Sequence, residues 1–181
     1  MALFTKGFNF SDLIDVIKDT AVTSAMIFLV LLGAEFFNSF IALTQITNEL
    51  ATFVISNELS PYLVVFCILV LYIILGCLMD SLAMILLTIP VFFPIIIELD
   101  FGMSIEEVAI WFGILTLIVV EVGLITPPVG LNVFIINKMA KNVPISDTFI
   151  GVLPFLISDL IRVGILFIFP GISLFLIRLF G

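Results

Sequence analysis

Residues 123–132, GLITPPVGLN, combine groups that a simple membrane-spanning helix does not need. Pro127 and Pro128 have no backbone N–H, so each takes the usual donor from a carbonyl one turn earlier. Gly123 and Gly130 allow backbone angles that other residues resist. Since a residue before a proline avoids the helical region, the pattern predicts that GLITPPVG is unwound rather than bent.

An unwound segment at membrane depth frees carbonyl oxygens, which are costly unless protein or a ligand satisfies them. The carbonyls near Gly123 and Leu124, with the Thr126 hydroxyl, would form a cluster of hard oxygen atoms that suits Na⁺ or another small cation. The second half-helix begins here with its positive dipole end, and Asn132 lies just inside it. The sequence therefore predicts a ligand site; a proline kink that binds nothing is the alternative.

A second polar interruption, GCLMDS at residues 76–81, separates two apolar runs. Asp80 lies in it, and Glu121 lies just before the first interruption. Ionisable groups at membrane depth usually face a cavity or a partner. Asp80 could face water, accept from amides of its own turn or contact the ion, and Glu121 could carry a proton or cap a neighbouring backbone. For both residues an orienting role and direct binding stay open.

The composition sets the environment of these groups. The 181 residues are 63% hydrophobic and have a mean hydropathy of +1.43, more than a water-soluble domain of this size can bury. Apolar runs approach the roughly 20 residues that a bilayer requires, and they lack the alternation of a β-barrel. The predicted fold class is therefore all-α and polytopic in a membrane.

Charge and residue types exclude several functions. The net charge is −8 without a basic patch, so no nucleic-acid partner is expected, and the absence of histidine excludes histidine catalysis and ligation. Cys67 and Cys77 lack metal-ligand spacing and are expected to pack as small apolar side chains. We expect no enzyme activity, no organic cofactor and no metal beyond Na⁺.

The N-terminal third is predicted to contain three helical pieces. Residues 1–19 lack the pattern of a cleavable signal peptide and instead place apolar side chains on one face, typical of a helix that lies along the membrane surface. That face contains Phe8, Phe10, Leu13, Ile14, Val16 and Ile17. Residues 20–58 are expected to hold a span at about 20–40 and a second helix at about 46–58.

Residues 60–102 contain two apolar arms on either side of the GCLMDS tip. Each arm has about 14–16 residues, whereas one full crossing needs about 20. Short arms joined by a polar tip predict a re-entrant helical hairpin, and two kinked full spans are the competing interpretation.

Residues 103–142 are predicted to form the broken helix, and residues 146–181 the end of the chain. Ser104 and Glu107 form a capping-box pattern, which predicts that the first half begins at Ile105. In the last segment Asp159 and Arg162 are three residues apart and are expected to pair. A final span is predicted at about 163–180, kinked at Pro170.

The distribution of basic residues predicts the orientation. Lys6 and Lys18 precede the first span, and Lys138 and Lys141 follow the broken helix. The positive-inside rule places both groups in the cytoplasm, with Arg178 at the outer end as an exception.

The stretches GCLMDSLAMILLTIPVFFP and WFGILTLIVVEVGLITPPVGLNVFI together resemble the large membrane subunit of tripartite ATP-independent periplasmic (TRAP) transporters, as do GVLPFL and FPGISLFL near the end. The resemblance extends from about residue 10 to the end of the chain. It implies two inverted repeats, each with a hairpin and a broken helix, in which a transport domain moves like an elevator against a scaffold. It also implies Na⁺-coupled uptake of organic acids, such as sialic acids or dicarboxylates, through a multi-pass permease of the bacterial inner membrane. Its partners would be a periplasmic substrate-binding protein and a small membrane subunit.

The resemblance also implies roles for particular residues. Gly76, Gly123, Thr126 and Val129 would supply oxygens to one Na⁺, and Asp80 and Ser81 would lie near the substrate at the hairpin tip. Pro127, Pro128, Gly130 and Asn132 would form the helix break, and Glu121 is a candidate coupling carboxylate. Residues 1–19 would be the arm helix, 60–102 and 103–142 the transport domain, and 20–58 and 146–181 the scaffold.

The length departs from that family, because only the second repeat is present. We expect a fragment, a split-gene product or an engineered half that lacks the N-terminal half of the permease and cannot transport unaided. A degenerate repeat that acts as a non-transporting interaction or scaffold protein is the alternative. The Thr126 and Pro127–Pro128 break and Asp80 favour the transporter, since a scaffold does not need an unwound segment. A channel or membrane enzyme is a third possibility, which no nucleophile–base pair or metal cluster supports.

Overall fold

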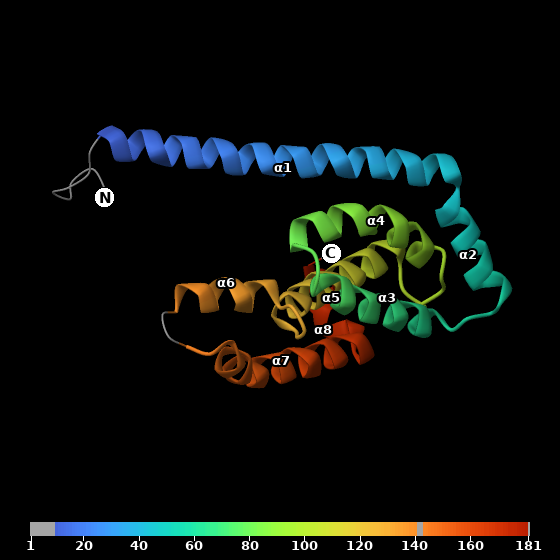
Figure 1. Cartoon of the computed structure of the whole chain (residues 1–181). Helices are drawn as coiled ribbons and strands as arrows, with labels where there is room; N and C mark the ends of the chain where they lie inside the picture. Colours follow the sequence, from blue (N-terminus) through green and yellow to red (C-terminus); the bar gives the residue numbers. More distant parts are fainter. Residues whose placement is uncertain (1–9, 141–142, 181) are drawn as a thin grey trace.

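The computed structural model describes residues 10–140 and 143–180, and every regular element in these ranges is a helix. The helices are α1 (Phe10–Thr44), α2 (Ile46–Ser56), α3 (Pro61–Gly76), α4 (Ser81–Ile97), α5 (Ile105–Ile125), α6 (Leu131–Met139), α7 (Ile145–Ile168) and α8 (Pro170–Phe180) (Figure 1). Among them α1, α5 and α7 are long and apolar enough to cross a membrane. The predicted all-α polytopic membrane fold is confirmed.

Helix α1 continues without a break through the boundary predicted at residues 19–20, so that boundary is wrong within the described residues; residues 1–9 lie outside them. Neither proline nor glycine occurs between Phe10 and residue 32, so nothing ends the helix there. The hydroxyls of Thr20 and Thr23 donate to the carbonyls of Val16 and Asp19, at 2.7 and 2.8 Å. The polar residues at the boundary are therefore satisfied inside one helix.

A corner at Gln45 separates α1 from α2. Gln45 has a left-handed backbone with a φ of 57°, which redirects the chain into a helix of 11 residues. The second helical piece predicted at 46–58 is confirmed and ends at Ser56. Figure 1 shows α2 descending from the end of α1 toward α3.

Helices α3 and α4 form the predicted hairpin. They have 16 and 17 residues, or about 24 and 26 Å at 1.5 Å per residue, against a hydrocarbon core of about 30 Å. The Thr88 hydroxyl donates to the Tyr72 hydroxyl at 2.8 Å, which joins the two arms. The short arms favour a re-entrant hairpin over two full spans.

Helix α5 is the centre of the molecule and contacts α3, α4, α6, α7 and α8. Trp111, Phe112 and Leu115 are almost fully buried in the main apolar core. The Trp111 indole N–H donates to the Leu166 carbonyl at 2.9 Å, which fixes α7 to α5. Helix α1, by contrast, packs against α4 and α2.

The end of the chain differs from its prediction. Helix α7 begins at Ile145, directly after Pro144, and continues through Pro154, so the span predicted to begin at residue 163 is wrong. The interruption predicted at Pro170 is confirmed, because α7 ends at Ile168 and Pro170 begins α8. Arg162 and Asp159 form the predicted ion pair at 2.9 Å.

Candidate functional site

The helix break covers residues 126–130, between α5 and α6. The prediction is correct for these residues and wrong for Gly123, Leu124 and Ile125, which remain helical. The Gly123 carbonyl, which loses a donor at Pro127, accepts the Thr126 N–H at 3.1 Å instead. This tighter last turn keeps α5 intact to Ile125. Gly130 then takes a φ of 55°, a left-handed angle that favours glycine, before α6 begins.

The oxygen atoms of the break are more occupied than the sequence predicted. The Thr126 hydroxyl donates to the Val122 carbonyl at 2.6 Å, so its proton is used, although its oxygen still has an acceptor lone pair. The Leu124 carbonyl loses its usual helical donor because Pro128 has no N–H. Oxygens for a cation at this break are therefore mainly backbone carbonyls.

Gly76 and Gly123 bring the hairpin tip against the break. A Cβ on Gly123 would lie 2.7 Å from the Cα of Gly76, and a Cβ on Gly76 would lie 2.8 Å from the Cα of Gly123. Since real Cβ atoms do not approach backbone so closely, only glycine fits at either position. Two of the four residues assigned to Na⁺ are thus in direct backbone contact, in the last turns of α3 and α5.

Cys77 completes this contact, which sequence reasoning missed. Its buried thiol lies 3.5 Å from the Thr126 carbonyl oxygen, 3.7 Å from that of Pro127 and 3.2 Å from that of Ile73. A thiol has one proton and donates weakly, to one of these oxygens at a time. Cys77 was expected to be an apolar packing residue; its place directly after Gly76 in the polar tip was the available signal.

Asp80 orders the other side of the tip. It is the N-cap of α4, and its Oδ1 accepts the N–H groups of Leu82 and Ala83, at 3.0 and 3.1 Å. Of the roles left open for Asp80, bonding to amides of its own turn is the one seen in the structure. Ser81 is the first residue of α4 and is partly buried.

The remaining predicted residues are less enclosed. Glu121 is exposed on α5, and its side chain forms no hydrogen bond or ion pair with another described residue. Pro127, Pro128 and Val129 are exposed, whereas Asn132 is partly buried in the first turn of α6. The structure gathers Gly76, Cys77, Gly123 and Thr126 and leaves residues 127–129 at the surface.

The oxygen atoms of this site suit a hard cation better than a transition metal. Within residues 10–140 and 143–180 no three Cys, Asp or Glu side chains lie close enough to hold a metal. The tip and the break instead offer carbonyl oxygens from two helix ends, the kind of ligand that hard cations prefer.

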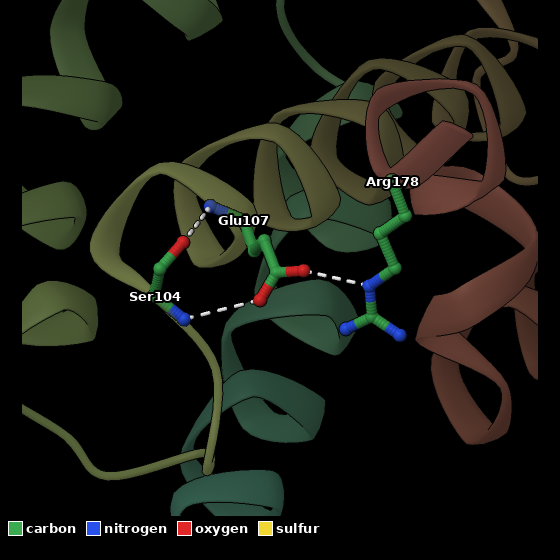
Figure 2. A network of polar contacts seen from close by, with 3 residues as sticks. All are labelled: Ser104, Glu107 and Arg178. Carbon is green, nitrogen blue, oxygen red and sulfur yellow. Dashed lines mark hydrogen bonds and ion pairs between the residues drawn. The ribbon is translucent and has the colours of Figure 1, made fainter. Parts of the chain in front are cut away.

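A separate polar network joins the start of α5 to the end of α8 (Figure 2). The predicted capping box is confirmed: the Ser104 hydroxyl accepts the Glu107 N–H at 3.2 Å, and Glu107 Oε2 accepts the Ser104 N–H at 3.1 Å. Glu107 Oε1 also pairs with Arg178 Nε at 2.6 Å. The charge of Arg178, an exception to the positive-inside rule, is therefore balanced by Glu107.

Comparison with known proteins gives one consistent result. The family model of the tripartite ATP-independent periplasmic transporter, DctM component, matches residues 1–172. The chain is 30% identical over 175 residues to the C4-dicarboxylate TRAP transporter large permease protein DctM of Pseudomonas aeruginosa, covering 96% of this chain and 39% of that protein.

Two further relatives have similar coverage. The sialic acid TRAP transporter large permease protein SiaM of Vibrio cholerae is 26% identical, over 92% of this chain and 38% of that protein. The ectoine TRAP transporter large permease protein TeaC of Halomonas elongata is 29% identical, over 94% of this chain and 38% of that protein. The chain thus spans well under half the length of these relatives.

Proposed function

The chain belongs to the DctM family of TRAP transporter large permeases, and from this premise we propose that it forms the C-terminal half of a Na⁺-coupled permease for small organic acids. The observation that carries the proposal is the contact between the hairpin tip and the helix break, at Gly76 and Gly123. Two interrupted helical elements that meet inside a membrane protein are the usual design of a binding site in secondary transporters.

In this proposal the coupling ion is Na⁺, held by backbone oxygens of Gly76, Gly123, Thr126 and Val129. The close approach of the two glycines supports this assignment, in which carbonyls of the tip and of the break would face a common point. A cation there would supply positive charge that draws both helix ends together. The Asp80 cap orders the tip on one side. A Na⁺ ion bound at the break would add to that order.

The substrate is proposed to bind beside the same break. The first turn of α6, with Gly130 and Asn132, presents backbone N–H groups and the positive end of a helix, which suit a carboxylate. The names of the relatives include a dicarboxylate, a sialic acid and ectoine as substrates. Identities of 26–30% to all three do not choose among them, so the proposal stops at a small organic acid.

The proposed assembly is larger than this chain. A second half of the permease would add the other hairpin and broken helix, with a small membrane subunit and a periplasmic substrate-binding protein as further partners. The complex would lie in the bacterial inner membrane and move as an elevator. Glu121, exposed in the described structure, is proposed to face one of these partners as a coupling carboxylate.

Uptake by a reconstituted complex tests the proposal. The chain is combined with an N-terminal permease half, the small subunit and the binding protein of a relative, and uptake is measured with and without a Na⁺ gradient. We expect uptake only with all partners and only with Na⁺. Uptake that needs the partners but ignores Na⁺ would refute the ion assignment.

A double substitution tests the break itself. Pro127→Ala with Pro128→Ala returns two N–H groups to the backbone and is expected to extend α5 and abolish Na⁺ dependence. The matched control is Pro154→Ala, which removes a proline from inside α7, away from the break. Unchanged Na⁺ dependence in the double variant would contradict a site at residues 126–130.

A further inference from the structure

A side-chain hydrogen bond joins α1 to α4. The Asn38 side-chain amide donates to the Leu86 carbonyl of α4 at 3.5 Å, a long hydrogen bond. Between α1–α2 and α3–α8 it is the one side-chain hydrogen bond across the residues that the structure describes. Figure 1 shows α1 lying along α4, with both helices running in the same direction.

The Leu86 carbonyl can accept from α1 because of a proline. Pro90 has no N–H, so the carbonyl four residues earlier lacks its usual helical donor. Pro94 repeats this one turn later and takes the usual donor from the Pro90 carbonyl. Helix α4 therefore carries two such carbonyls four residues apart, on the same side of the helix.

Asn38 borders a cavity that also reaches Pro90 and Pro94. Asn38 Oδ1 is buried without a hydrogen-bond partner in the described structure. A cavity of about 320 Å³ lies beside it, lined by Asn38, Ile41, Ala42, Gln45, Thr47, Asn48, Pro90 and Pro94. Both prolines border this space, so the interface between α1 and α4 is not closed by packing on the side of Pro90.

We propose that Asn38 is a positioning residue that holds the hairpin arm α4 against α1 in either of two registers, one helical turn apart. In the first register it donates to the Leu86 carbonyl, as the structure shows. In the second, α4 has moved about 6 Å, the rise of four residues, toward the N-terminus of α1, and Asn38 donates to the Pro90 carbonyl. One-turn shifts of packed helices are a known form of two-state change. The role of the two registers in transport rests on the proposed function, whereas the contact between Asn38 and α4 does not.

Cysteine cross-linking can measure the two registers while Asn38 stays in place. Ile41, Leu87 and Val91 line one further cavity between α1 and α4, and Leu87 and Val91 are one turn apart. The reporter pairs are Ile41→Cys with Leu87→Cys, and Ile41→Cys with Val91→Cys. Both are made with Cys67→Ala and Cys77→Ala and oxidised in native membranes. The readout is the yield of the 41–91 cross-link relative to the 41–87 cross-link.

The two prolines give opposite expectations, which separates this proposal from general loosening of the helix. Pro94→Ala restores the donor of the Pro90 carbonyl and should lower the 41–91 share about three- to fivefold. Pro90→Ala restores the donor of the Leu86 carbonyl and should raise it by a similar factor. Asn38→Leu should remove the difference between the two proline variants, and Asn38→Gln should retain it.

Shifts in the same direction, or no shift in either proline variant, would overturn the two-register proposal. Uptake by the reconstituted complex, measured on a chain that retains Cys77, separates this result from the proposed function. Na⁺-dependent uptake with an unchanged cross-link ratio would refute the registers alone. Opposite shifts without Na⁺ dependence would refute the ion coupling alone.

Discussion

Helices α5 and α1 are both long enough to cross a membrane, yet they occupy opposite environments. In its most apolar window α5 is 56% buried inside the molecule, whereas α1 is 6% buried. Helix α5 contacts both hairpin arms and both C-terminal helices, whereas the main contacts of α1 are with α4 and α2. Apolar length therefore marks a helix for the membrane, but it does not tell whether that helix lies at the centre of the fold or at its edge.

The largest expected difference is between two phenylalanines. Phe112→Ala removes a side chain that is 1% exposed in the α5 core and should lower the free energy of unfolding by about 3–5 kcal/mol. Phe36→Ala, at a position 68% exposed on α1, should have little effect, because lipid or detergent replaces the lost contacts. Thermal unfolding in detergent, followed by circular dichroism, gives both values. Equal effects would mean that α1 has a core of its own.

Two glycines provide the next comparison. Gly123→Ala forces a Cβ against the Gly76 backbone and should cost about 1–3 kcal/mol, and it should also disturb Na⁺-dependent uptake. Gly33→Ala in α1 meets nothing within 4 Å and should be neutral or slightly stabilising, because alanine favours a helix. Unfolding and uptake are measured on the same preparations. A harmless Gly123→Ala would contradict the close contact.

The two arms of the hairpin differ in their caps. Asp80→Ala removes the side-chain cap of α4 and should cost about 1 kcal/mol. Ser60→Ala is the control, because the Ser60 side chain makes no capping bond to α3. Hydrogen exchange of the first turn of α4 should accelerate in the Asp80 variant alone. Equal exchange rates in both variants would show that the Asp80 cap does not order the tip.

The smallest effect is expected at the N-terminal end of α5. Glu107→Gln weakens the ion pair with Arg178. Both side chains of this pair are partly exposed to solvent, so the effect on stability should be small and should decrease with added salt. Glu106→Gln changes a neighbouring charge that forms no ion pair in the described structure and serves as the control. A large, salt-independent loss in the Glu107 variant would mean that the pair supports α8 more than its exposure indicates.

Local chemistry allowed much of this fold to be predicted from the sequence. The Ser104 cap, the interruption at Pro170 and the break after Thr126 each follow from one or two residues whose backbone preferences act within a turn. The false boundary at residue 19 had no such cause, since polar residues alone do not end a helix. The span expected from residue 163 failed for the reverse reason, because α7 accommodates Pro154 within the helix.

Contacts between distant parts of the chain could not be predicted in the same way. The sequence pointed to Gly76 and Gly123 separately, but not to their backbone contact. Cys77 was expected only to pack, because its carbonyl acceptors at Thr126 and Pro127 become its neighbours only in the folded chain. The pairs Arg178–Glu107 and Asn38–Leu86 likewise depend on which helices become neighbours.

The contact between Gly76 and Gly123 also bears on how such sequences can change over generations. A side chain gained at one glycine cannot be compensated at the other, because no residue is smaller than glycine. To relieve the clash, α3 and α5 would have to move apart, and this would disrupt the core around Trp111. The two positions are therefore expected to be inherited as one unit, kept or lost together across related sequences.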